Sequence, residues 1–172
     1  AWLKFICSNS ASCTSVKTGI RSVLPNVHLK DISFNVRAGE IVGFAGLVGA
    51  GRSEVMRALF AVDRRETGEI FVNGKKVEIN STVDALNAGL GFVPEDRNVD
   101  GLVGTFSVAE NLVLNRYNEP PFARGLSMKP AVVGANAEEK ITEFDIRTQS
   151  AATPAGTLSG GNQQKVVMAL EL

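Results

Sequence analysis

The stretch Glu40–Glu54, EIVGFAGLVGAGRSE, joins an apolar run, a glycine-rich segment and the start of a helix. The run from Glu40 to Ala45 is typical of a central strand that is buried on both faces of a sheet. After the glycines, the sequence EVMRALFAV places four large apolar residues on one helical stripe: Val55, Met56, Leu59 and Phe60. The order of strand, glycine-rich loop and helix predicts an α/β fold with a phosphate-binding loop.

The loop from Gly46 to Ser53 fits the pattern G-x-x-x-x-G-[K]-[ST], with Arg52 standing where lysine is expected. Glycines let backbone N–H groups point into one concavity, and the helix N-terminus adds partial positive charge. Arg52 keeps a positive charge, but its guanidinium is planar and longer-reaching than the compact ammonium group of lysine. A turn that only connects strand and helix is the alternative interpretation. The predicted phosphate-binding residues are Gly46, Val48, Gly49, Ala50, Gly51, Arg52, Ser53 and Glu54.

A second motif, LSGGNQQK, covers Leu158–Lys165 and leads into the apolar helical stretch VVMALEL. Ser159 can cap that helix, and the two glycines after it expose backbone donors at its first turn, which favours an anion. A serine cap with a purely structural role is the alternative. The combination of this motif with an earlier phosphate loop is far more specific than either alone. The candidate residues are Leu158, Ser159, Gly160, Gly161, Asn162 and Gln163.

The 172 residues carry 18 Lys plus Arg and 18 Asp plus Glu, a formal net charge of +0. This balance argues against a strongly basic nucleic-acid-binding protein, so no nucleic-acid partner is expected. The two cysteines, Cys7 and Cys13, match neither a common zinc spacing nor a disulfide framework. No stretch is apolar over the length that a membrane-spanning helix needs.

Other segments have readable patterns. We expect a strand through Ile32, Phe34 and Val36, a hairpin over 69–79, a helix over 81–88 and a strand over 90–93. Ser107 and Glu110 have capping-box spacing and predict a helix to about residue 115. Residues 119–134 resemble a loop, residues 137–144 a helix, and residues 1–22 a serine-rich loop segment.

Together these motifs resemble the ATP-binding subunits of ABC transporters. The likeness is carried by Leu29–Glu54 (LKDISFNVRAGEIVGFAGLVGAGRSE), GFVPEDR and DGLV within Gly91–Val103, SVAENL at Ser107–Leu112, and LSGGNQQK. More narrowly, residues 27–172 are similar to the C-terminal ATPase half of sugar-importing subunits of the ribose, galactose and xylose type.

The resemblance implies a P-loop NTPase (ABC ATPase) core with a small antiparallel β part and an inserted α-helical subdomain at about 105–165. Residues 23–172 would then be a partial ATP-binding domain that ends before the Walker B strand, behind a separate segment of residues 1–22. It also implies an ATPase component of a monosaccharide importer that couples ATP binding and hydrolysis to transport. Such a subunit lies peripherally on the cytoplasmic face of the cell membrane.

The resemblance implies ATP and Mg²⁺ as cofactors. The partners it implies are a second ATPase half, membrane permease subunits and, indirectly, a sugar-binding protein. Arg52-Ser53-Glu54 follows the pattern of that half, whose loop belongs to the weaker of two composite ATP sites. The LSGG segment would contact ATP held by the opposing half. Glu95 falls at the Q-loop position, and it and Ser53 are the candidate Mg²⁺ ligands. A solvated turn is the other interpretation of Glu95.

The sequence contains no apolar run followed by Asp-Glu, and its single histidine, His28, precedes the phosphate loop. The family's Walker B and switch-histidine residues are therefore absent from residues 1–172, and no catalytic residue is assigned. We expect this chain alone not to hydrolyse ATP measurably, since hydrolysis needs a group that orients water. Alternatives are a non-catalytic nucleotide-binding regulatory half, an inactive fragment, or a P-loop protein outside this family such as a small GTPase.

Overall fold

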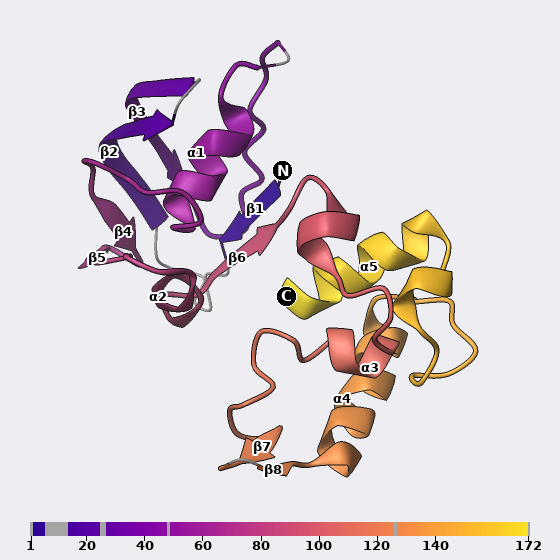
Figure 1. Ribbon diagram of the computed structural model, residues 1–172. Helices are drawn as coiled ribbons and strands as arrows, with labels where there is room; N and C mark the ends of the chain where they lie inside the picture. Colours follow the sequence, from indigo (N-terminus) through magenta and orange to yellow (C-terminus); the bar gives the residue numbers. More distant parts are fainter. Residues whose placement is uncertain (1, 6–13, 25–26, 48, 126, 172) are drawn as a thin grey trace. The chain divides into compact units, whose positions relative to one another are not determined.

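The computed structural model describes residues 2–5, 14–24, 27–47, 49–125 and 127–171. The chain forms two compact units, Ala1–Phe92 and Val93–Leu172 (Figure 1). Within the described residues, no helix has both the length and the apolar character required to cross a membrane.

The first unit combines short two-stranded sheets with two helices. Its elements are β1 (Trp2–Phe5), β2 (Thr14–Leu24), β3 (Val27–Val36), α1 (Arg52–Leu59), β4 (Ile70–Val72), β5 (Lys75–Val77), α2 (Thr82–Asn87) and β6 (Leu90–Val93). β2 pairs with β3 and β4 with β5, both antiparallel, and β1 pairs with β6.

The prediction of a loop for residues 1–22 was wrong where the structure describes this segment. β1 and most of β2 lie there, and β2 pairs with β3 from Thr14 opposite Val36 to Leu24 opposite Val27. The register shifts on either side of Ile20. Such irregularities break the two-residue alternation by which a strand is recognised in a sequence. Residues 1 and 6–13 lie outside the described residues.

The predicted strand through Ile32, Phe34 and Val36 is confirmed as part of β3. In β3, Val36 is buried and Ile32 and Phe34 are partly buried, whereas Ser33 and Asn35 are exposed. A turn follows β3, where Gly39 has φ +74°, a conformation that glycine adopts at little cost.

The run Glu40–Ala45 does not form the predicted buried strand. Ile41 is 88% exposed and Leu47 is 86% exposed, and residues 40–47 belong to no strand. A strand needs a hydrogen-bonded neighbour as well as apolar side chains, and none of the described strands pairs with this run. Phe44 still makes an edge-on contact with Phe34, with ring centroids 4.8 Å apart.

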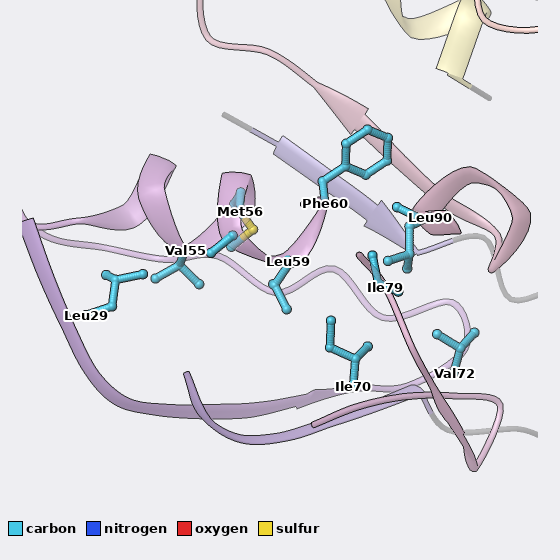
Figure 2. Close-up of a cluster of buried hydrophobic side chains, with 11 residues drawn as sticks. Leu29, Val55, Met56, Leu59, Phe60, Ile70, Val72, Ile79 and Leu90 are labelled. Carbon is cyan, nitrogen blue, oxygen red and sulfur yellow. The ribbon is translucent and has the colours of Figure 1, made fainter. Parts of the chain in front are cut away.

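The core of the first unit forms where α1 packs against the sheets (Figure 2). The predicted helical stripe is confirmed, since Val55, Met56 and Leu59 are buried and Phe60 caps the helix C-terminus. Phe60 also stacks on Phe92 at 5.4 Å between ring centroids. The other buried members are Leu29, Ala58, Ile70, Val72, Ile79, Ala85 and Leu90.

The predicted hairpin and short helix are both present. β4 and β5 place Ile70 opposite Val77, and the turn uses Asn73 and Gly74 at φ +54° and +76°. Positive φ at both positions suits the twist of a two-residue hairpin. α2 follows, capped by Ser81, whose side chain accepts a hydrogen bond from the Asp84 backbone N–H.

The second unit is mainly helical. Its elements are η1 (Arg97–Gly101, a π-helix), α3 (Val108–Asn111), β7 (Ala123–Arg124), β8 (Ser127–Met128), α4 (Pro130–Glu143), η2 (Ala155–Thr157, a 3₁₀ helix) and α5 (Gly160–Glu171). The capping box is confirmed: Ser107 Oγ accepts from the Glu110 N–H, and the Glu110 carboxylate accepts from the Ser107 N–H. Ser107 Oγ also donates to the Glu110 carboxylate at 2.7 Å, and this bond, followed by the one from the Ser107 backbone N–H, lowers the pKa of Glu110.

Two boundaries in this unit differ from the predictions. α3 ends at Asn111 and continues as turns, because the Asn111 side chain bonds Val103, Phe106 and Ser107 and joins the helix end to the preceding loop. Residues 119–134 are not all loop, since they contain the β7–β8 hairpin and the start of α4. Pro130 occupies the first turn of α4, where its missing N–H costs nothing.

We predict that Leu59→Ala lowers the free energy of unfolding by about 2–5 kcal/mol, because Leu59 is fully buried in the first core and the mutation leaves a cavity. Val83→Ala is the matched control, since Val83 lies on α2 and is 57% exposed. Urea unfolding of both variants measures the difference. Equal losses would mean that this cluster is not the core of the unit.

Candidate functional site

The phosphate loop is shaped by two glycines. Gly49 and Gly51 have φ of +82° and +80°, values that a side chain would oppose, and they flank Ala50. The Ala50 N–H donates to Leu47 O at 3.1 Å, which makes a tight turn. Gly51 is the N-cap of α1, and Val55 N–H donates to its carbonyl at 3.0 Å. A turn of this kind directly before a helix presents backbone donors to an anion.

Arg52 lies across its own loop. Its Nη2 donates to Leu47 O at 3.3 Å, and its Cδ lies 3.7 Å from the position of a Cβ built on Gly46. Such a Cβ would also come within 3.1 Å of Ala50 Cβ, so Gly46 permits this close approach. The guanidinium thus makes a long hydrogen bond to a neutral carbonyl, which a charged phosphate oxygen can replace favourably.

Ser53 and Glu54 occupy the first turn of α1 and are both partly buried. Mg²⁺ usually keeps several waters and takes one or two protein ligands beside substrate phosphates. A single hydroxyl from Ser53 fits that requirement. The residues that the structure describes contain no group of three or more His, Cys, Asp or Glu that could hold a metal. Val48 lies outside the described residues.

The LSGGNQQK motif forms the start of α5. Ser159 precedes the helix, and its carbonyl accepts the first helical hydrogen bond, from Gln163 N–H at 2.9 Å. Ser159, Gly160 and Gly161 are exposed, whereas Leu158 packs against the second unit's core. A Cβ on Gly161 would meet no atom within 4 Å. The start of α5 is thus exposed, with open space beside Gly161, whereas the Arg97 guanidinium lies against Gly160.

Asn162 and Gln163 face inward from this surface. Asn162 Oδ1 accepts from the Arg147 N–H at 2.9 Å, and Asn162 Nδ2 donates to Ser159 Oγ at 3.0 Å. Gln163 is 9% exposed, and its Nε2 donates to the carbonyls of Ala155 and Gly156. Both side chains therefore fix the start of α5 to neighbouring segments of the same unit.

Arg97 contacts the LSGGNQQK motif, which the sequence did not predict. Its Nε donates to Gln163 Oε1 at 3.1 Å, 66 positions along the chain. Asp96 caps η1 by accepting from the Asn98 N–H. No spacing rule links residues so far apart, so only the fold brings Arg97 to the motif.

Lys165, the last residue of the motif, anchors the second turn of α5. Its Nζ donates to Asp145 Oδ2 at 2.7 Å and also to the Asp145 carbonyl. This hydrogen bond and the charge of Lys165 lower the pKa of Asp145. Glu95 is exposed two positions before Arg97, and its role as a Q-loop residue and Mg²⁺ ligand stays a prediction.

Comparison with known proteins gives consistent matches. A family model described as ABC transporter matches residues 29–172. The chain is 46% identical over 145 residues to the ribose import ATP-binding protein RbsA of Oceanobacillus iheyensis, covering 83% of this chain and 28% of that protein. It is also 46% identical over 144 residues to RbsA of Bacillus subtilis, covering 81% and 28%. The chain spans less than a third of the length of these relatives.

A solved structure shares the fold. It is an ATP-binding cassette, solved as a dimer in a post-hydrolysis state with ADP and Pi bound. The match has a TM-score of 0.68 at 23% identity and covers 93% of this chain and 68% of that one.

We predict that Gly160→Ala displaces the Arg97 guanidinium, because the new Cβ would lie 2.8 Å from Arg97 Nη2. Gly161→Ala is the matched control, since its Cβ meets open space, and its higher helix propensity is worth up to about 1 kcal/mol. The Arg97 Nε–H resonance in NMR spectra should shift in the first variant only. An unshifted signal in Gly160→Ala would contradict this packing.

Proposed function

This chain belongs to the ABC transporter family, and from that premise we propose that it is part of the ATPase subunit of a monosaccharide importer. The predicted fold, a P-loop NTPase of the ABC ATPase type, is confirmed by the same family match and by the structural likeness. The substrate class comes from the relatives, which are ribose import ATP-binding proteins. The transported sugar contacts other subunits, so this chain would act on ATP alone.

The observation that carries the proposal is the loop conformation at Gly49 and Gly51, immediately before α1. The triphosphate would lie against this turn and the N-terminus of α1, where backbone donors and the helix dipole stabilise negative charge. Arg52 would exchange its bond to Leu47 O for a phosphate oxygen. Ser53 would hold Mg²⁺, which neutralises charge on the phosphates when bound.

The second motif would serve a different nucleotide. Ser159, Gly160 and Gly161 form an exposed helix start, which suits contact with ATP held by the phosphate loop of an opposing ATPase half. Closing such a pair would move membrane permease subunits through the Glu95 region and the helices of residues 105–150. The subunit would then lie peripherally at the cytoplasmic face of the membrane and engage a sugar-binding protein only indirectly.

A non-catalytic nucleotide-binding role is the second candidate for residues 1–172. It is favoured by two sequence observations: the 172 residues contain no Asp-Glu pair, and Arg52 replaces the lysine of the phosphate loop. Without a group that orients water, bound ATP would stay intact. The chain would then bind nucleotide and respond to it without turnover of its own.

We predict that Arg52→Ala weakens Mg²⁺-ATP binding to the chain about 10- to 100-fold, the range for loss of a hydrogen bond to a charged group. Equilibrium dialysis with labelled ATP measures the affinity. Lys75→Ala is the control, since Lys75 is exposed on β5 outside the loop and should bind as the unchanged chain does. Equal affinity in all three proteins would contradict the proposed contact between Arg52 and a phosphate oxygen.

We predict that Ser159→Arg, made in the full-length subunit, lowers ATP use at the opposing half's phosphate loop. A bulky cation would block the exposed helix start, whereas nucleotide binding by this half's own loop should stay within about twofold, because the two motifs serve different nucleotides. Turnover and labelled-ATP binding are measured on the same preparation. Equal loss of both would contradict the division of roles.

A further inference from the structure

Asn162 and Ser159 are joined by a hydrogen bond whose direction is fixed by a third group. The Arg147 backbone N–H can only donate, and it lies 2.9 Å from Asn162 Oδ1. The carboxamide oxygen of Asn162 is therefore turned toward Arg147, and its NH₂ group is turned toward Ser159 Oγ, 3.0 Å away. In this pair Ser159 is the acceptor.

The anchor for Asn162 is well held. Arg147 directly follows Ile146, which is buried at 4% exposure in the second unit's core and whose N–H bonds Ile141 O at 2.9 Å. The residue before it, Asp145, pairs with Lys165 on the next turn of α5. The side-chain carboxamide of Asn162 therefore cannot flip, exchanging Oδ1 and Nδ2, without losing its bond to the Arg147 N–H.

This arrangement leaves the Ser159 proton for another acceptor. A serine hydroxyl has one proton to donate, and the bond from Asn162 does not use it. A donor that itself accepts a hydrogen bond is also a stronger donor, since the bonds polarise one another. Ser159 is exposed at the N-terminus of the twelve-residue helix α5, where an anionic acceptor is favoured.

We propose that Asn162 is a positioning residue: it accepts from the Arg147 N–H, donates to Ser159 Oγ, and so keeps the Ser159 hydroxyl as a donor toward a phosphate oxygen of the nucleotide on the opposing half. The inference rests on the proposed function of this helix start. It assigns Asn162 a role through Ser159 and not a contact with nucleotide.

Asn162→Asp in the full-length subunit tests the direction of the bond. Aspartate has the same shape, and one carboxylate oxygen still accepts from the Arg147 N–H. The other oxygen can only accept, so Ser159 must donate to it and loses its proton for phosphate. We expect kcat/KM for ATP to fall about 10- to 100-fold, and by less than tenfold in Asn162→Ala. A purely structural role predicts the reverse order, because Asp keeps the Arg147 bond and Ala does not.

A second comparison removes the effect of added charge. In a Ser159→Ala background no hydroxyl remains to be oriented. Asn162→Asp should therefore cost at least fivefold less in kcat/KM than in the unchanged protein, and Asn162→Ala should leave kcat/KM within about twofold. If Asn162→Asp costs as much there as in the unchanged protein, charge repulsion explains it and the inference is overturned. Thermal unfolding checks that each variant is folded. If Asn162→Asp does not fold, the comparison of Asn162→Ala in the unchanged protein and in the Ser159→Ala background tests the role of Asn162 by itself.

The outcomes separate the inference from the proposed function. Suppose that Ser159→Ala lowers turnover but Asn162→Ala costs more than Asn162→Asp, the order expected for a purely structural role. Then only the role of Asn162 fails. If Ser159→Ala leaves turnover unchanged, the proposed role of this helix start fails and the inference falls with it. Labelled-ATP binding to the same subunit's own phosphate loop should stay constant throughout, which shows that the loss arises at the opposing site.

Discussion

The proposed phosphate site depends on one backbone constraint. The chain between Leu47 and α1 turns through positive φ at Gly49 and Gly51. The turn leads directly into the N-terminus of α1, whose backbone N–H groups are the donors that would face a bound anion. The core of the first unit holds the helix that follows the turn, because Val55, Met56 and Leu59 of α1 are buried in it. Arg52 reaches across the loop to Leu47 O through a hydrogen bond that a phosphate oxygen could replace.

The second unit also presents a helix N-terminus, that of α5, but without a phosphate loop before it. There Ser159, Gly160 and Gly161 are exposed, open space lies beside Gly161, and groups of the same unit hold the motif in place. Arg97, Arg147 and Asp145 each fix one residue of the motif, namely Gln163, Asn162 and Lys165. A motif of eight residues is therefore divided into an exposed half and an anchoring half. In the proposed function, the exposed residues Ser159, Gly160 and Gly161 would meet the nucleotide of the opposing half.

Much of this could be predicted from the sequence where the pattern is local. The stripe of α1, the Asn73-Gly74 turn and the Ser107–Glu110 capping box each depend on residues within a few positions of one another. The failures involve distant partners. Glu40–Ala45 has the composition of a strand but no neighbour to pair with, β2 is interrupted by register shifts, and Arg97 reaches Gln163 only through the fold. The roles of the individual site residues toward ATP remain proposals.

The most direct test of the central claim is an NMR titration of the chain with Mg²⁺ and a non-hydrolysable ATP analogue, followed through backbone amide signals. The account predicts that the amides from Gly49 to Ser53 shift most, because they would donate to phosphate oxygens, and that those of Gly160 and Gly161 stay unchanged until an opposing half is added. Saturable binding that leaves the Gly49–Ser53 amides unshifted would contradict it.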